Sequence, residues 1–206
     1  MILSGIDLQV DVGECVAMLG RSGSGKTTLA RALYGAIPCR RGVIRFMDEV
    51  VTSEAAYERA NRGIAYVPQG RQIFLELSVM ENLVLDAYAA QFDKTRTDRA
   101  VEKLLEYFHT LKPKLKDLGG GLNAGQQQLL AVARALMSEP KILLLDEPSD
   151  GVDPSLLDEI AATVKKNLER DRPCGTHVRA KPSVRKKTCC ARVRDSGRCY
   201  QTKCSH

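Results

Sequence analysis

A glycine-rich segment near the start of the chain has the composition of a phosphate-binding loop. Residues 20–28 read GRSGSGKTT, which fits the pattern G-x-x-x-x-G-K-T, and they follow the apolar run 15–19. Glycines let consecutive backbone N–H groups turn toward a polyphosphate, and the positive end of a following helix adds attraction. Lys26 would supply charge for the β- and γ-phosphates, and Thr27 a hydroxyl for Mg²⁺. An ordinary turn needs no Lys-Thr at this offset, so the segment predicts binding of a nucleoside triphosphate.

Three further polar residues follow apolar runs. Asp146 and Glu147 come directly after residues 142–145, four apolar residues typical of a strand buried on both faces of a parallel sheet. Beside a phosphate loop, such an aspartate would hold Mg²⁺, and the next acid would take a proton from an attacking water. Gln69 follows the run 64–67, and its amide would ligate Mg²⁺ or orient water. Each residue alone fits a solvated strand end or turn, but together with the loop they favour hydrolysis.

The surrounding pattern alternates strands and helices, which predicts an α/β fold with a parallel sheet. Ser78 and Glu81 form a capping box, and Val101, Leu104 and Phe108 mark one face of an amphipathic helix. The expected strands are residues 15–19, 43–46, 64–67 and 142–145; the expected helices are 26–37, 78–90, 97–111, 124–137 and 153–169.

The last part of the chain differs from the rest. Residues 172–206 hold ten of the 31 Lys and Arg, one of the 25 Asp and Glu, and five of the seven Cys. The net charge of +6 therefore sits in this tail, and the body is slightly acidic, so charge does not indicate nucleic-acid binding by the body. Without periodicity or paired C-x-x-C spacing, we expect the tail to be unstructured and without zinc. One hypothesis for its composition is translation in a shifted reading frame.

Four motifs in order resemble those of the ABC-transporter ATPases. Residues 122–126, LNAGQ, resemble the family's signature segment, usually LSGGQ, and residues 20–28, 66–69 and 141–148 match its other motifs at plausible spacings. The resemblance covers about residues 1–170. Residues 63–74 and 77–83 are similar to the ATPases of branched-chain amino-acid uptake, whereas residues 125–128 and 146–154 resemble the sister group for urea and short amides.

The resemblance implies a P-loop NTPase (RecA-like) core, residues 1–171, with a helical subdomain inserted at about 76–137. ATP and Mg²⁺ are the implied cofactors. The implied nucleotide contacts are Gly20, Ser22, Gly23, Gly25, Lys26, Thr27 and Thr28. Thr27, Gln69 and Asp146 would hold Mg²⁺, Glu147 would be the general base, and Gln69 would sense the metal. Asn123, Gly125 and Gln126 would act in trans on the nucleotide of a second subunit.

The implied function is ATP hydrolysis that drives uptake of branched-chain amino acids, urea or short amides. The implied partners are an identical or different second ATPase subunit, transmembrane permease subunits and, indirectly, a solute-binding protein. No run is apolar enough to span a membrane and no secretory signal begins the chain, so we expect a cytoplasmic protein attached to the membrane through the permeases. One alternative is a truncated, catalytically impaired remnant. Another is a nucleic-acid-associated ATPase using the basic tail, which one tyrosine and no Phe or Trp make less favourable.

The sequence departs from the family in three places. Asn123 and Ala124 replace the usual Ser and Gly of the signature segment, and the Ala124 Cβ would hinder close approach to a phosphate. We expect the family's N-terminal strand, with its adenine-stacking aromatic residue, to be missing. We also expect the last core strand, which ends in His or Gln, to be missing, and we interpret His177 as a tail residue without a site role.

Overall fold

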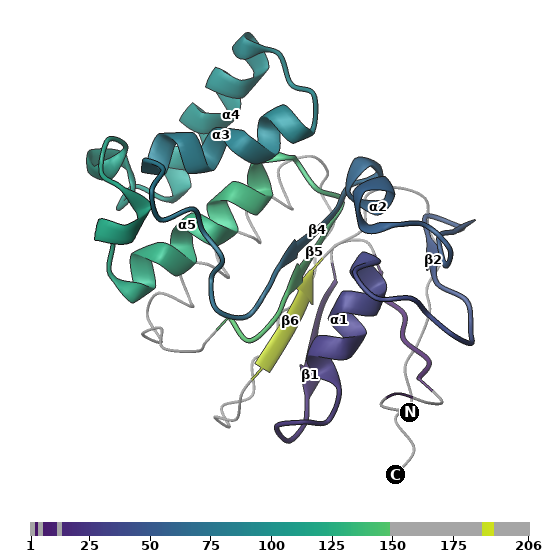
Figure 1. Cartoon of the computed structure of the whole chain (residues 1–206). Coiled ribbons are helices and arrows are strands. Elements are labelled where there is room, and N and C mark those ends of the chain that lie inside the picture. Colours follow the sequence, from purple (N-terminus) through teal and green to yellow (C-terminus); the bar gives the residue numbers. More distant parts are fainter. Residues whose placement is uncertain (1–2, 4–5, 12–13, 149–186, 192–206) are drawn as a thin grey trace.

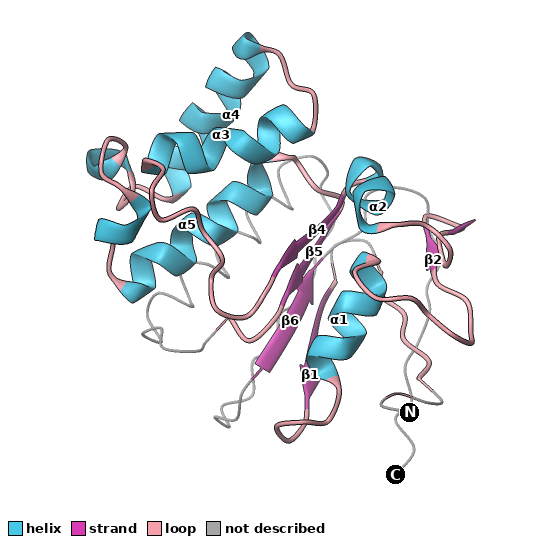
Figure 2. Ribbon diagram, viewed as in Figure 1, coloured by secondary structure: helices cyan, strands magenta, loops and turns pink. Residues whose placement is uncertain are grey.

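The computed structural model describes residues 3, 6–11, 14–148 and 187–191, and a sheet with helices on both sides forms its centre (Figure 1). One group of helices covers one side of the sheet and the other helices lie on the opposite side (Figure 2). The described α-helices are α1 (Lys26–Tyr34), α2 (Ala56–Arg62), α3 (Val79–Ala89), α4 (Lys94–Tyr107) and α5 (Ala124–Met137). None of the helices in these ranges combines the length and apolar character that crossing a membrane requires.

The order of the main sheet brings three strand ends to one edge. The strands β1 (Cys15–Leu19), β6 (Lys187–Ala191), β5 (Ile142–Leu145) and β4 (Ile64–Val67) lie side by side in that order. β4 and β5 are parallel, and β6 is antiparallel to both β1 and β5. β1, β4 and β5 therefore run in the same direction, and the segments that follow them meet at the carboxyl edge of the sheet, where α/β folds bind ligands.

The strand β6 corrects one expectation. Residues 187–191 were expected to be unstructured with the rest of the tail, but β6 pairs with β1 on one side and with β5 on the other, in an antiparallel direction. Backbone N–H and C=O groups make this pairing, and leaving such groups unpaired inside a sheet is costly. A strand can therefore form here without the apolar run by which a buried strand is recognised in a sequence. The expectation that the family's last core strand, which ends in His or Gln, is missing falls on residues outside the described ranges and stays a prediction. Residue 177 and the helix expected at 153–169 lie outside the described residues.

Two hydrophobic clusters lie on opposite sides of the central strands. Leu143 and Leu145 pack in the cluster formed with α3, α4 and α5, whereas Leu144 packs with Phe46, Val51 and other residues near α1. All three leucines are buried, and their alternation is that of a strand covered on both faces. The interpretation of residues 142–145 as a doubly buried strand is confirmed.

The predicted helices within the described residues are present, but two of them have other bounds because capping residues were not recognised in the sequence. Ser78 accepts a hydrogen bond from Glu81 N at 3.2 Å, and Glu81 Oε2 accepts one from Ser78 N at 2.7 Å, so the predicted capping box begins α3. α1 ends three residues earlier than predicted because Gly35, with φ 89°, closes it in the left-handed conformation. α4 runs over 94–107 rather than 97–111, because Asp93 caps its start. α2 was not predicted.

A small hairpin replaces the strand expected at residues 43–46. β2 (Arg45–Phe46) pairs with β3 (Glu49–Val50), and Met47 and Asp48, with φ 51° and 66°, make the two-residue turn between them. Such turns match the twist of hairpin strands but require positive φ at both positions. Short 3₁₀ turns, Lys112–Lys114 and Gly119–Gly121, connect α4 to α5.

Candidate nucleotide-binding site

The glycine-rich loop between β1 and α1 has the conformation that phosphate binding requires. Gly23 and Gly25 have φ of 79° and 91°, values that favour glycine, and Gly25 is the N-cap of α1. Lys26 Nζ donates hydrogen bonds to the carbonyl oxygens of Gly20 and Arg21, both at 3.1 Å. The lysine therefore folds back over the loop, where its charge faces the space that the loop encloses. Ser22 lies within the loop, and Thr27 and Thr28 lie in the first turn of α1.

Gly20 and Gly23 of this loop differ in what a side chain at each position would meet. A Cβ at Gly20 would lie 2.5 Å from Ser24 Oγ, so the Ser24 side chain would have to move to make room for it. A Cβ at Gly23 would meet nothing within 4 Å, which means that the space beside this backbone is open. Gly23 is glycine because of its backbone angle, and a phosphate can approach its N–H closely.

Asp146 lies between α1 and β4 with both carboxylate oxygens engaged. Thr27 Oγ1 donates to Asp146 Oδ1, and Tyr66 Oη donates to Asp146 Oδ2, each at 3.1 Å. Asp146 is only 1% exposed. Burial and, next, the charge of Asp146 raise the pKa of Tyr66 to about 12, while Arg31 acts in the opposite direction. Tyr66 therefore remains a neutral hydrogen-bond donor that orients the carboxylate toward Thr27.

Gln69 and Glu147 meet where β4 and β5 end. Val67 lies opposite Leu145 in the sheet, so Gln69 and Glu147 both stand two residues beyond this pair. Gln69 Nε2 donates to Glu147 Oε2 at 2.8 Å. Glu147 has φ 48°, an uncommon conformation for a residue with a Cβ, and such outliers concentrate at functional sites.

Comparison with known proteins identifies the family. The family model described as ABC transporter matches residues 3–150. The chain belongs to this family. The high-affinity branched-chain amino acid transport ATP-binding protein BraG of Pseudomonas aeruginosa is 37% identical over 164 residues, which cover 80% of this chain and 70% of BraG. The lipopolysaccharide export system ATP-binding protein LptB of Escherichia coli K12 is 39% identical over 181 residues, which cover 86% of this chain and 72% of LptB.

The fold agrees with this membership. A solved structure of the ATP-binding subunit of an ABC transporter superposes with a TM-score of 0.64 at 26% identity, and the match covers 74% of this chain and 62% of that one. The chain thus spans less than two thirds of that structure. Within the part that it covers, the chain shares the fold of this ATP-binding subunit.

The signature segment of this ABC subunit begins α5. Asn123 is the N-cap: its Oδ1 accepts from Gln126 N at 2.9 Å, and its own N–H donates to Gln126 Oε1 at 3.2 Å. Gly125 lies in the same first turn. In Figure 1 the start of α5 lies apart from the loop between β1 and α1, so these three residues do not join the phosphate loop of their own chain.

The residues at the sheet edge fit ATP and Mg²⁺. A hydroxyl, a buried carboxylate, an amide and a second carboxylate are hard oxygen ligands of the kind that Mg²⁺ prefers. No group of three or more His, Cys, Asp and Glu within the described ranges could hold a metal by itself. Mg²⁺ commonly takes one or two protein oxygens together with phosphate and water, so this smaller set is sufficient.

Sequence reasoning missed three residues that support the site. One is Tyr66, the partner of Asp146. Another is Asn82, fully buried on α3, which accepts from Phe74 N at 2.9 Å and donates to the carbonyls of Phe74, Leu77 and Ser78. An asparagine within the apolar face of a predicted helix was the available signal for it.

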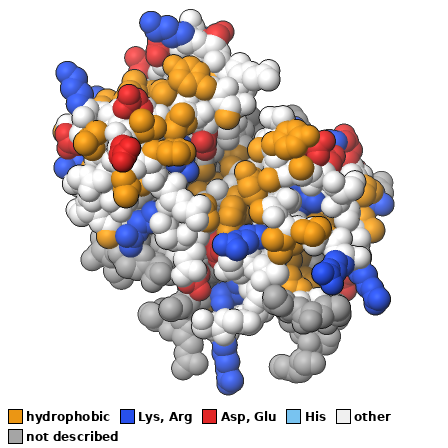
Figure 3. Space-filling model, in the orientation of Figure 1, with side chains coloured by type: hydrophobic (Ala, Val, Ile, Leu, Met, Phe, Trp, Pro, Cys, Tyr) orange, Lys and Arg blue, Asp and Glu red, His pale blue; other side chains and the backbone are white. Residues whose placement is uncertain are grey.

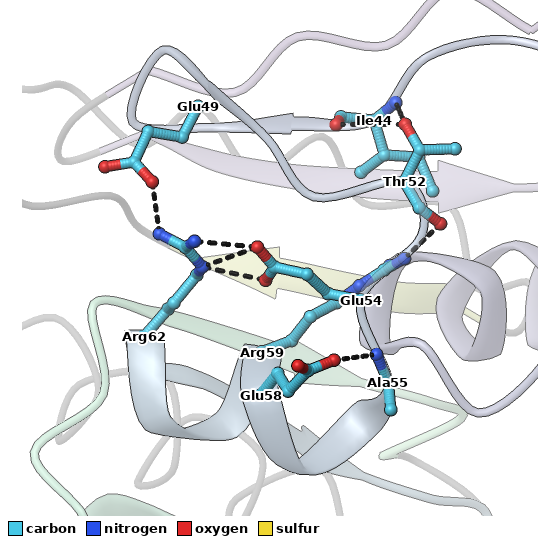
Figure 4. Close-up of polar contacts among 8 residues, drawn as sticks. All are labelled: Ile44, Glu49, Thr52, Glu54, Ala55, Glu58, Arg59 and Arg62. Atoms are coloured by element: carbon cyan, nitrogen blue, oxygen red, sulfur yellow. Dashed lines mark hydrogen bonds and ion pairs between the residues drawn. The ribbon is translucent and has the colours of Figure 1, made fainter.

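Arg59 is the third missed residue, and it fixes the end of α1 away from the loop. Its guanidinium donates to the carbonyls of Ala32 and Leu33 at 2.6 and 2.7 Å, and to the carbonyl of Thr52 at 3.0 Å. Figure 4 shows it beside Arg62, which pairs with Glu54 and Glu49. Burial lowers the pKa of Arg59, and nearby Glu54 opposes this shift. No sequence motif marked this buried arginine.

Proposed function

We propose that this ABC subunit binds MgATP at loop 20–28, hydrolyses it with Glu147 as general base, and thereby drives solute uptake through separate membrane subunits. One arrangement carries the proposal: the Thr27–Asp146 and Gln69–Glu147 hydrogen bonds lie beside the Lys26 loop at one sheet edge. These residues come from three strand ends, and each has the chemistry that its place in the reaction needs.

Hydrolysis would proceed with few groups. Lys26 would exchange its bonds to the loop carbonyls for bonds to phosphate oxygens. Glu147 would accept a proton from a water that attacks the γ-phosphorus, while the bond to the leaving ADP oxygen breaks and ADP and phosphate form. Because Gln69 donates to Glu147 Oε2, the other carboxylate oxygen would be the one to accept this proton. Bound Mg²⁺ would neutralise phosphate charge, and Thr27 and Asp146 would hold it, with Gln69 sensing it.

A second ATPase subunit, identical or different, would complete the site. Asn123, Gly125 and Gln126 begin α5 at a helix N-terminus, which attracts phosphate, yet they lie apart from their own phosphate loop (Figure 1). Asn123 is exposed. A head-to-tail pair would bring this helix end to the γ-phosphate bound by the partner subunit.

Exposed apolar side chains support attachment to permease subunits on the cytoplasmic face of a membrane. Phe74, Leu75 and Leu118 are each more than half exposed. Gly120 N donates to Leu75 O at 2.9 Å, and Gly119 N donates to Leu77 O at 2.8 Å, so these segments lie together just beyond Gln69. Figure 3 shows further apolar side chains on the helical group. We propose that the membrane subunits dock here and that a solute-binding protein acts through them.

The proposed solutes are branched-chain amino acids, or urea and short amides. BraG serves branched-chain amino-acid transport, and residues 63–74 resemble the ATPases of that group, whereas residues 146–154 resemble the sister group for urea and short amides. LptB serves lipopolysaccharide export, and its comparable identity makes export the competing function.

Hydrolysis is tested by comparing the full chain with Glu147→Gln. We expect Mg²⁺-dependent phosphate release from the wild type and a loss of about 10²- to 10⁴-fold in the variant. ATP affinity, measured with a fluorescent nucleotide, should stay within about twofold because the substitution spares Lys26 and Thr27. ATP binding without turnover in the wild type would instead identify an impaired remnant.

The direction and solute are tested in the native organism. Cells with Glu147→Gln in the chromosomal copy should lose uptake of labelled leucine, or of urea and acetamide, relative to wild type. Unchanged uptake together with a defect in outer-membrane lipopolysaccharide would overturn the import proposal in favour of export.

A further inference from the structure

We propose that Arg134 is a positioning residue of the ATPase cycle, which links the helix of the signature segment to the loop that carries Gln69. The proposal rests on the function proposed above and adds a residue that its motifs do not include. Arg134 lies on α5, the helix that Asn123 begins, and its Nη2 donates to the carbonyl oxygen of Gln72 at 3.1 Å. Gln72 is three residues beyond Gln69.

The segment that Arg134 contacts is strained. Gly70, Arg71 and Gln72 have φ of 84°, 70° and 42°, so three consecutive residues are left-handed and two of them carry a Cβ. Gln72 N also donates to Gly70 O at 2.8 Å, which closes a tight turn. Such a conformation persists only where surrounding contacts impose it. The hydrogen bond from Arg134 is one such contact, so the turn after Gln69 depends on the position of α5.

The guanidinium of Arg134 also contacts the helical group. Its Nε lies 3.7 Å from Asp86 Oδ1 on α3, and its central carbon lies 5.3 Å from the centre of the Phe74 ring. The Arg134 side chain is 15% exposed. Burial raises the pKa of Asp86, and Arg134 opposes this by favouring the carboxylate. One side chain therefore contacts α3, the turn after Gln69 and Phe74 from a position on α5.

The bonds of Arg134 are incomplete in this conformation. Its buried Nε and Nη1 have no hydrogen-bond partner within the described part of the chain, and 3.7 Å to Asp86 is too long for a hydrogen bond. Buried donors favour arrangements that satisfy them. A small displacement of α5 would let Arg134 form a hydrogen bond with Asp86. The same displacement would change the hydrogen bond from Arg134 to the carbonyl oxygen of Gln72. Closure of the signature segment on a partner's nucleotide would thus be transmitted to Gln69 and Glu147.

A single tryptophan can report this link. The chain has no tryptophan, so Phe74→Trp places one fluorophore beside Arg134 and Gln72. In this background we expect MgATP to shift the tryptophan emission, and we expect Arg134→Met to abolish the shift while ATP still binds. Equal shifts with and without Arg134→Met would overturn the proposal.

Kinetics on the chain without the tryptophan give a second readout. Arg134→Met should lower kcat about tenfold while the ATP dissociation constant stays within about twofold, and Arg134→Lys should restore part of the rate. Arg96→Met is the matched control, because Arg96 also makes an ion pair, with Glu139, and lies over an aromatic ring, Phe92, but on α4. An equal loss in Arg96→Met would indicate a structural effect and overturn the proposal.

These measurements separate this proposal from the proposed function. If the wild type binds ATP without turnover, hydrolysis fails as a proposal, and the emission shift alone decides the role of Arg134. If Arg134→Met lacks the wild-type thermal transition, Arg134→Lys is compared in its place. A reduced shift in that variant supports the link, and a full shift with a full rate overturns it.

Discussion

Gln69 and Glu147 are joined by a hydrogen bond of 2.8 Å from Nε2 to Oε2, although 78 positions separate them in the sequence. The parallel pairing of β4 and β5 brings them together, because Val67 and Leu145 are opposite each other and both strands end there. Glu147 leaves its strand in a left-handed conformation that the amide of Gln69 helps to hold. The proposed base is therefore oriented by the residue proposed to sense the metal.

Replacing Gln69 with alanine should lower the rate more than the affinity. Without the hydrogen bond from the Gln69 amide, the Glu147 side chain can adopt more rotamers. We therefore expect kcat to fall about 10- to 100-fold. The ATP dissociation constant should change less than about threefold, since Lys26 and the loop are untouched. Steady-state phosphate release and nucleotide binding measure the two quantities. Gln91→Ala, an exposed position after α3, is the control. A kcat equal to that of the control would contradict the orienting role.

Tyr66→Phe should weaken the alkaline dependence of stability. The pKa of Tyr66 is raised to about 12 from an ordinary value of 10.0. The neutral phenol therefore contributes fully to the free energy of unfolding below pH 10, and this contribution is lost as the pH rises from 10 to 12. Tyr34, whose pKa burial also raises, acts in the same direction. Urea unfolding at pH 9 and 11 should show a smaller loss for Tyr66→Phe than for wild type. The control variant Tyr57→Phe, which changes an exposed side chain, should lose as much unfolding free energy between pH 9 and 11 as the wild type does.

Sequence predicted most accurately those features that depend on local chemistry. The run 142–145 and the box of Ser78 and Glu81 are confirmed because each depends on nearby residues alone. The site residues at the ends of β1, β4 and β5 could be named because parallel strands end at a common edge.

Features that depend on partners far away in the chain could not be predicted from the sequence. Arg59 is buried because carbonyls from α1 and from Thr52 surround it, and no pattern around residue 59 indicates them. Asp146 was predicted, but its partner Tyr66 was not, because their pairing follows from sheet register. The strand β6 was missed because backbone pairing, rather than an apolar run, holds it between β1 and β5.

Restoring the family's usual signature residues should raise turnover. Asn123→Ser keeps an N-cap oxygen, and Ala124→Gly removes a Cβ at the first position of α5, where a partner's phosphate would approach. We expect the double variant to hydrolyse ATP several-fold faster at protein concentrations that favour pairing. Ala56→Gly is the matched control, since Ala56 is likewise the first residue of a helix, α2. An unchanged rate in the double variant would show that these positions tolerate the substitution.

Arg59 and Arg62 lie on one helix three residues apart, yet their removal should differ strongly (Figure 4). Arg59→Met would leave the half-buried carbonyls of Leu33 and Thr52 without the donor that Arg59 supplies, which should cost about 3 kcal/mol of unfolding free energy. Arg62→Met breaks ion pairs with Glu54 and Glu49 at the surface, where water replaces them, so its loss should be much smaller. Chemical denaturation of both variants measures the difference. Arg59 bonds to the C-terminal end of α1, and the phosphate loop precedes the N-terminal end of the same helix. Arg59→Met should therefore also weaken ATP binding. Equal losses of stability in the two variants would mean that α1 does not depend on this buried cap.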